Sequence, residues 1–158
     1  MSEVFNTPFE LGVRMVHLLM ALYPRKVDLQ RLVYLDYAAI YSADLNGPES
    51  LHTPVPLRGG EYASRREVIE EGLYLMAQRS FIDVKADYSG ISFQLGDNGP
   101  ALVGLIGGEY SRELFSRCEW VTSVLGDKKI KELEELFGMR GALWGAEFVP
   151  SQQTGDPQ

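Results

Sequence analysis

The sequence predicts a mostly helical α+β fold that contains one β-hairpin. Several segments place apolar residues at helical spacing, and two short segments alternate apolar and polar residues on either side of a glycine-bearing turn. The chain has 158 residues, of which 45% are hydrophobic. That is enough to bury a core in one compact domain, with room for an appendage.

The first two helices are predicted from their caps. Thr7 is a candidate N-cap, with Pro8 at the first helical position and a glutamate three residues after the cap, and this helix should end before Pro24. Asp28 should cap a second helix over residues 29–45. This second helix is apolar nearly all round, so we expect it to lie between other elements.

A long loop and a third helix follow. Residues 46–62, NGPESLHTPVPLRGGEY, hold three prolines and three glycines, which argues against regular helix in this stretch. The third helix is expected from about Ser64 to Ser80. Its apolar residues form one stripe at helical spacing: Val68, Ile69, Leu73 and Met76.

A hairpin and further helices complete the chain. FIDVKA (81–86) and ISFQL (91–95) alternate around the turn DYSG, and Asp97 or Asn98 should cap the next helix. Residues 110–126 are amphipathic, and residues 127–140 form a last helix of mixed charge. The apolar positions of these two helices are Leu114, Cys118, Val121 and Leu125, then Ile130, Leu133 and Phe137. The closing segment GALWGAEFVP should lay Trp144 and Phe148 onto a surface groove.

Three helices, a hairpin and then more helices is the order of a winged helix. We therefore expect a winged-helix core over residues 1–108 and a C-terminal helical extension over residues 109–149 packed on it. Residues 150–158 are polar and are predicted to be a disordered tail.

Charge and composition narrow the class of function. The formal net charge of −7 disfavours tight non-specific binding to nucleic acid or to an anionic membrane. One cysteine and two histidines, His17 and His52, leave no multi-cysteine metal site. The first residues lack a basic signal-peptide region, and the apolar run that follows is too short to span a bilayer. We expect a cytoplasmic protein without a metal or cofactor.

No catalytic motif is present, and we predict that the chain is not an enzyme. The sequence lacks GxxxxGK[ST], GxSxG, HExxH and CxxC. In the loop, Gly59 and Gly60 are read as a tight turn, with a phosphate cradle as the alternative. His52 is interpreted as a loop histidine bonded to backbone, with a partner contact or catalysis as alternatives.

Two further residues have competing interpretations. A buried carboxylate at Asp36 would need a cation, and Arg58 or an arginine of the third helix is expected to supply it, so that Asp36 pins the loop to the core. A catalytic acid is the alternative for this residue. Trp120 lies off the apolar face of its helix, and either anchors an interface or packs under the C-terminal segment.

The third helix is the one that would enter a DNA groove, yet it is acidic. Residues 61–79 carry a net charge of −1, and the hairpin adds only Lys85 against Asp83 and Asp87. DNA-reading helices present Arg, Lys, Asn or Gln to the nucleobases and basic side chains to the phosphates. A DNA reader would need Arg58, Arg65 and Arg66 to form one exposed patch at the start of this helix.

Several segments resemble a known family. NTPFELGVRMVHLLMALYP, VDLQRLVYLDYAAIYSAD, LHTPVPLRGGE and WGAEF are similar to the middle component of bacterial ABC-three component systems, type 2, over about Asn6 to Phe148. The resemblance implies a subunit encoded beside a large ATPase related to SMC and Rad50 and beside a third component, often an effector. Such systems are thought to act in bacterial conflict, chiefly against phage or plasmids. The family has no assigned catalytic residues, so none is carried over.

Three functions are considered. The first is a winged-helix adaptor that links an SMC/Rad50-like ATPase to its effector, as a monomer or a homodimer, with the near-heptad helix at Leu114 to Leu125 and the C-terminal segment as contact surfaces. The second is a winged-helix DNA-binding regulator or sensor that touches nucleic acid weakly or within the complex. The third is an enzyme, which would need His52, Asp36 and Glu61 to converge. We favour the adaptor, and its candidate contacts for a partner or a phosphate are His52, Arg58, Gly59, Gly60, Glu61, Arg65 and Arg66.

Overall fold

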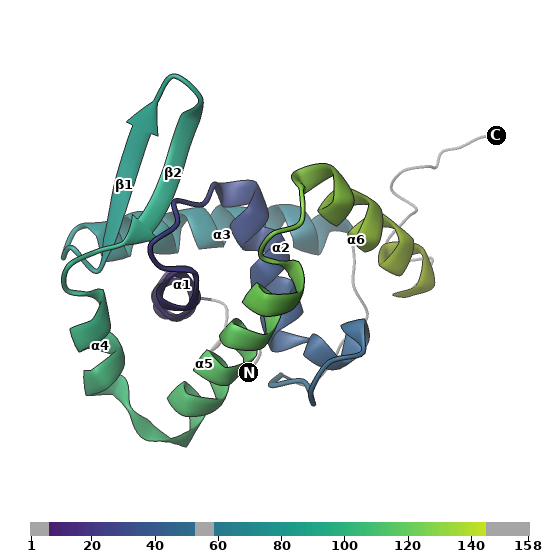
Figure 1. The fold of residues 1–158 in the computed structure, drawn as a ribbon, viewed down its shortest axis with the longest axis horizontal. Coiled ribbons are helices and arrows are strands. Elements are labelled where there is room, and N and C mark those ends of the chain that lie inside the picture. The colour runs from purple at the N-terminus through teal and green to yellow at the C-terminus, as the bar shows by residue number, and fades with distance from the viewer. Residues whose placement is uncertain (1–6, 53–58, 145–158) are drawn as a thin grey trace.

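The computed structural model describes residues 7–52 and 59–144, and the side chains of residues 7–52 and 65–137. The fold is mostly helical α+β, as the sequence predicts (Figure 1). The elements in chain order are α1 (Pro8–Leu22), α2 (Leu29–Ile40), the 3-10 helix η2 (Ser42–Leu45), α3 (Gly59–Ala77), β1 (Ile82–Asp87), β2 (Gly90–Leu95), α4 (Gly99–Ile106), α5 (Gly108–Leu125) and α6 (Ile130–Trp144).

The N-caps predicted for the first two helices are formed. The backbone N–H of Glu10 donates to the Thr7 hydroxyl oxygen at 3.1 Å, and Pro8 is the first residue of α1. The N–H of Arg31 donates to Asp28 Oδ1 at 2.9 Å at the start of α2. These bonds satisfy amide groups that the first turn of a helix otherwise leaves without partners. Asn98 is at the N-cap position of α4, but its side chain makes no capping bond and instead donates to the Arg79 carbonyl at 3.0 Å.

The second and third helices differ from their predicted bounds. α2 ends at Ile40 instead of continuing to Leu45, because the backbone turns at Tyr41 and the chain continues as the 3-10 helix η2. The Ser42 hydroxyl donates to the Pro48 carbonyl at 2.8 Å, which holds this turn against the returning loop. α3 begins at Gly59, so the prediction of no helix before about Ser64 was wrong. The helix therefore begins at the glycine pair despite the low helix propensity of glycine.

The core lies between the helices and the base of the hairpin. α1 packs against both α3 and α5, and α2 packs against α5. Side chains of α5 join the same buried cluster as those of α1, α2 and α3. The largest fully buried side chains include Phe93, Leu11, Met15, Leu35, Ile69 and Leu73.

The hairpin is antiparallel and is attached to the helices at its base. Cα partners run from Ile82 and Leu95 at the base to Asp87 and Gly90 at the turn. Gly90 has φ 122°, a backbone conformation that favours glycine. An isolated bridge pairs Phe93 with Val27 in the connection between α1 and α2. The outer half of the hairpin projects away from the helical body (Figure 1).

The near-heptad face of α5 is part of the core. Leu114, Cys118, Val121 and Leu125 are all buried within the chain, so this face is not available as the contact surface that the sequence suggested. α1 and α2 of the same molecule already cover these side chains.

The last helix is longer than predicted. α6 extends to Trp144, so GALW is helical and does not belong to a separate closing segment. Leu133 is buried, and Ile130 and Phe137 pack against the core as partly buried residues. The side chain of Trp144 and all of Phe148 lie outside the described residues, as does the tail over residues 150–158.

Candidate functional site

A buried ion cluster joins the first three α-helices. Asp36 of α2 is 2% exposed and accepts two hydrogen bonds from Arg14 of α1, from Nε to Oδ1 at 2.9 Å and from Nη2 to Oδ2 at 3.0 Å. Nη1 of Arg65, on α3, donates to Asp36 Oδ2 at 3.1 Å. The carboxylate is therefore paired with two guanidinium groups, as a buried charge requires.

Each charged group of this cluster favours the ionised form of its partner. Burial alone would raise the pKa of Asp36, but the positive charges and hydrogen bonds of Arg14 and then Arg65 outweigh it, so the pKa of Asp36 is lowered. Burial likewise acts to lower the pKa of Arg14, and the neighbouring Asp36 carboxylate raises it above its ordinary value. Both groups are ionised at neutral pH, so Asp36 is not available as a general acid there.

Arg65 is enclosed by aromatic rings as well as by the carboxylate. Its guanidinium carbon lies 5.8 Å from the ring centroid of Tyr37 and 5.9 Å from that of Tyr41. Contacts of this length between a cation and a ring are favourable. The Tyr37 hydroxyl in turn donates to Asp44 Oδ2 at 3.2 Å. Arg65 is thus directed inward and does not share an exposed patch with Arg66, which is exposed on α3.

His52 lies beside this cluster. Its Nε2 is hydrogen-bonded to the Tyr110 hydroxyl at 2.9 Å, and the two rings are stacked with centroids 6.3 Å apart. Burial, and then the positive charges of Arg14 and Arg65, lower the pKa of His52 to about 4. His52 is therefore neutral at physiological pH and contacts a side chain of α5.

Asp36 connects α2 to α1 and α3, whereas other groups hold the described part of the loop, residues 46–52. The backbone N–H groups of Leu51 and His52 donate to the carbonyl of Ile40 at 3.0 and 3.3 Å. Nε of Arg117 donates to the carbonyl of Glu49 at 2.9 Å. The expectation that Asp36 pins the loop is therefore corrected for residues 46–52: the C-terminal end of α2 and a side chain of α5 hold it.

The remaining predicted site residues are not brought into one cluster by the described part of the chain. Arg58 lies outside the described residues, and Gly59, Gly60 and Glu61 are in the first turn of α3, where the side chain of Glu61 is not described. Trp120 is half-buried and packs closely on Gly47, since a Cβ at Gly47 would overlap its indole ring.

A second histidine ties α1 to α5. Nδ1 of His17 lies 2.8 Å from the Val13 carbonyl, which can only accept, so Nδ1 carries the proton. Burial lowers the pKa of His17, and the neutral ring then accepts a hydrogen bond at Nε2 from the Ser111 hydroxyl at 2.8 Å. Ser111 is itself buried, so this bond satisfies both groups inside the core.

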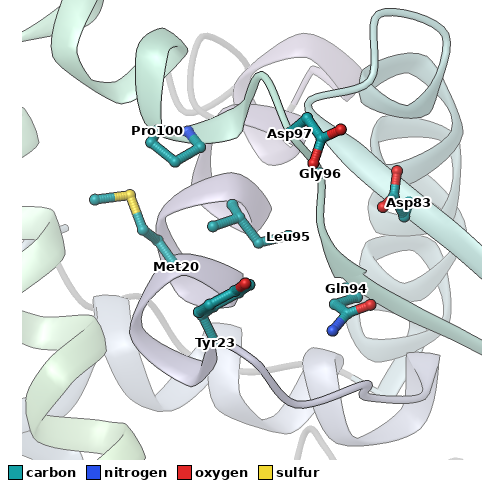
Figure 2. Close-up of a pocket in the computed structure, with 8 residues that line it drawn as sticks. All are labelled: Met20, Tyr23, Asp83, Gln94, Leu95, Gly96, Asp97 and Pro100. Carbon is teal, nitrogen blue, oxygen red and sulfur yellow. The ribbon is translucent and has the colours of Figure 1, made fainter.

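One open pocket lies apart from the ion cluster. It has a volume of about 500 Å³ between the end of α1, the base of the hairpin and the start of α4. Figure 2 shows the polar side chains Asp83, Gln94 and Asp97 on one side of it, opposite Met20 and Tyr23. None of the candidate contact, buried-acid or interface residues proposed from the sequence lines it.

The described residues form neither a metal-binding cluster nor a membrane-spanning helix. Within residues 7–52 and 59–144, no group of three or more His, Cys, Asp and Glu side chains is arranged to hold a metal ion. No helix in this part of the chain is both long enough and apolar enough to cross a membrane.

Comparison with known families identifies the chain. A family model for the ABC-three component (ABC-3C) system Middle Component 2 matches residues 4–147. The chain belongs to this family. The resemblance noted from LHTPVPLRGGE and WGAEF is thereby confirmed. Comparisons with curated proteins and with solved structures gave no significant match.

As a Middle Component 2, the protein is one component of an ABC-3C system, and it has partners within that system. The match extends over every described helix and both strands. The Arg14–Asp36–Arg65 cluster and the hairpin therefore lie within the residues that the family model matches.

Sequence reasoning missed Arg14 and Tyr110. Arg14 interrupts an apolar run of the first helix. A charged residue on a helix that is apolar over most of its circumference is itself a signal of a buried ion pair, and this signal could have matched Arg14 to Asp36. Tyr110 gave no comparable signal, since its pairing with His52 spans 58 positions of sequence.

Proposed function

We propose that this Middle Component 2 is a non-catalytic adaptor in the cytoplasm of a bacterial cell. It would bridge the SMC/Rad50-like ABC ATPase of its system and the effector component, in a system directed against phage or plasmids. The ATPase would handle DNA, and the middle component would contact protein. Winged-helix accessory subunits of SMC-like complexes provide an analogy for this arrangement.

The observation that carries this proposal is the charge of the exposed side of α3. Glu67, Glu70 and Glu71 are exposed there, whereas Arg65 is directed inward to Asp36. A helix that reads DNA presents basic and amide groups to the duplex, because affinity for a polyanion depends on cations. This face is therefore better suited to a polypeptide.

The state of the polar side chains agrees with a non-catalytic role. Asp36 is ionised and engaged by two arginines, and His52 is neutral and bonded to Tyr110. Burial raises the pKa of the Cys118 thiol, which keeps the thiolate, the reactive form, from forming. In each case, the environment favours a structural role over proton transfer or nucleophilic attack.

Co-expression with the products of the neighbouring reading frames tests the proposal. The tagged chain should retain both the ABC ATPase and the third component through size-exclusion chromatography, and should retain each of them when the other is omitted. A chain that elutes alone in all three mixtures would contradict the adaptor role. Capture of only one component would reduce the role from a bridge to an accessory subunit.

A further inference from the structure

The exposed side of α3 forms a stripe with two chemical halves. Residues at positions i, i+3, i+4, i+7, i+8 and i+11 all face outward, which is one side of a helix. The first half of this stripe is acidic and the second half is mainly apolar. Its residues are Glu67, Glu70, Glu71, Tyr74, Leu75 and Gln78.

The apolar half of the stripe continues onto the hairpin. The ring of Tyr74 packs edge-on against Phe93, with centroids 5.7 Å apart and planes at 79°. Phe93 is the cross-strand partner of Val84, and the next pair outward on the same face is Ala86 with Ile91. Paired residues of antiparallel strands project to the same side, so these apolar side chains form one row from the core towards the tip.

The outer end of this row has no covering element among the described residues. Val84 is 37% exposed, Ile91 is 50% exposed, and Tyr88 at the turn is fully exposed. The opposite face of the hairpin carries Asp83 and Lys85 instead. An apolar face exposed along one side of a hairpin is costly in water unless another molecule covers it. We call Val84, Tyr88, Ile91 and the α3 stripe together the α3–hairpin surface.

We propose that the α3–hairpin surface binds a basic, amphipathic segment of another protein component of the ABC-3C system. Apolar side chains of that segment would cover Tyr74, Val84 and Ile91, and its Lys or Arg residues would face the acidic half of the stripe. Opposite charges that meet across an interface direct partner choice and accelerate association. The inference rests on the proposed adaptor function and adds the chemistry of the partner.

Charge also favours a basic partner segment over a second copy of the chain, duplex DNA or the chain's own terminal residues. A second copy of the chain, docked through the same surface, would place its own glutamates against these three or against the apolar half, neither of which is complementary, and duplex DNA would be repelled by the glutamates. Arg66 borders the stripe, one helical turn before Glu70, and offsets only one of the three acids. Residues 1–6 and 145–158 of this chain contain no Lys or Arg and so do not match the acidic half.

The test uses the full-length chain assembled with the ABC ATPase and the third component. The variant Glu70→Lys/Glu71→Lys reverses the charge of the stripe, and Val84→Thr/Ile91→Thr keeps β-branched residues while it removes apolar contact. Each should weaken binding to one component by roughly tenfold or more. Wild-type binding should fall as salt is raised, because charge contributes to it.

Matched controls separate a specific surface from general effects. Glu113→Lys/Glu119→Lys makes the same charge change at exposed positions of α5, and Leu105→Ser removes an exposed apolar side chain from α4. Both controls should bind as the wild type does. Circular dichroism and the unfolding midpoint of every variant verify that it is folded.

A photocrosslinking amino acid at position 88 identifies the occupant. The expected product joins Tyr88's position to a segment of a partner component in which Lys or Arg alternates with apolar residues at helical or strand spacing. Crosslinks to a second copy, to added duplex DNA or to an acidic segment would overturn the inference, as would full binding by both surface variants. If only the surface inference fails, the wild-type chain still assembles with both components, and the adaptor function stands. If the wild-type chain binds neither component, both the adaptor function and the proposed basic partner segment are contradicted.

Discussion

Gly12 of α1 and Gly72 of α3 lie so close that neither position has room for a side chain. A Cβ at Gly72 would lie 2.7 Å from the backbone nitrogen of Gly12 and 2.6 Å from the carbonyl oxygen of Pro8. A Cβ at Gly12 would lie 2.8 Å from the carbonyl oxygen of Gly72. The atoms that obstruct Gly72 are all backbone, so a side chain at this position could be accommodated only if one helix moved. This crossing sets the position of α3, and with it the direction of its exposed stripe.

Substitution Gly72→Ala should therefore destabilise the protein, although alanine is the better helix former. We expect the free energy of unfolding to fall by about 1–3 kcal/mol, the usual cost of inserting a methyl group into a closely packed contact. Urea denaturation followed by circular dichroism measures the change. The matched control is Gly104→Ala in α4, where a Cβ would meet no atom within 4 Å. That control should be neutral or up to about 1 kcal/mol more stable, and equal effects at the two positions would contradict the close crossing.

Removal of the charge at Asp36 should be much more damaging than removal of a surface charge. Asp36→Asn leaves two buried or nearly buried guanidinium groups without their carboxylate, which costs roughly 3–5 kcal/mol in comparable cases. Asp127→Asn breaks the ion pair with Arg25, in which the Asp127 side chain is 95% exposed, and should cost no more than about 1 kcal/mol. Thermal and urea unfolding of both variants provide the comparison. A small loss for Asp36→Asn would show that the cluster does not hold the three helices together.

Stability should decrease as the pH falls from about 6.5 to about 4. The pKa of His52 is about 4 in the folded chain, below the ordinary value of 6.5, so in this window the unfolded chain binds a proton that the folded chain does not. The pKa of His17 is lowered in the same direction. His52→Gln keeps a hydrogen-bonding group near Tyr110 without titrating, and should flatten the decline without abolishing it. An unchanged slope in this variant would mean that His52 is not protected from protonation.

The isolated chain should not shift duplex DNA in an electrophoretic assay, even at low ionic strength. The exposed side of α3 is acidic, and Arg65 is engaged by Asp36, so few cations are available to displace counterions from a duplex. A shift that weakens steeply with added salt and disappears in Arg66→Ala would favour the DNA-binding alternative. Non-cognate duplex serves as the control for any residual binding.

Local sequence signals predicted most of the fold. Thr7 and Asp28 are capping residues whose bonds involve neighbours three positions away, so they can be recognised without knowledge of the tertiary structure. The hairpin follows in the same way from the alternation that ends in the Gly90 turn. The start of α3 could not be predicted by this method, because the helix begins at Gly59 although the propensity of glycine argues against helix there.

The candidate site was less accessible to sequence reasoning. Asp36 was singled out correctly as a group that needs a cation, but its principal partner, Arg14, is 22 positions away on another helix. Local periodicity carries no information about which helices meet. The expectation of an arginine from the third helix is confirmed by Arg65, whereas Arg14 was not among the expected partners. The α3–hairpin surface depends in the same way on the contact between Tyr74 and Phe93, which appears only once the hairpin is folded back onto α3.

The bridge between Val27 and Phe93 gives the hairpin a mechanical connection to the second helix. Val27 directly precedes Asp28, which caps α2, and the two backbone bonds of the bridge are each 2.8 Å long. The hairpin and the first turn of α2 are therefore held together by backbone hydrogen bonds as well as by side-chain packing. A hairpin anchored in this way has a fixed direction relative to α2.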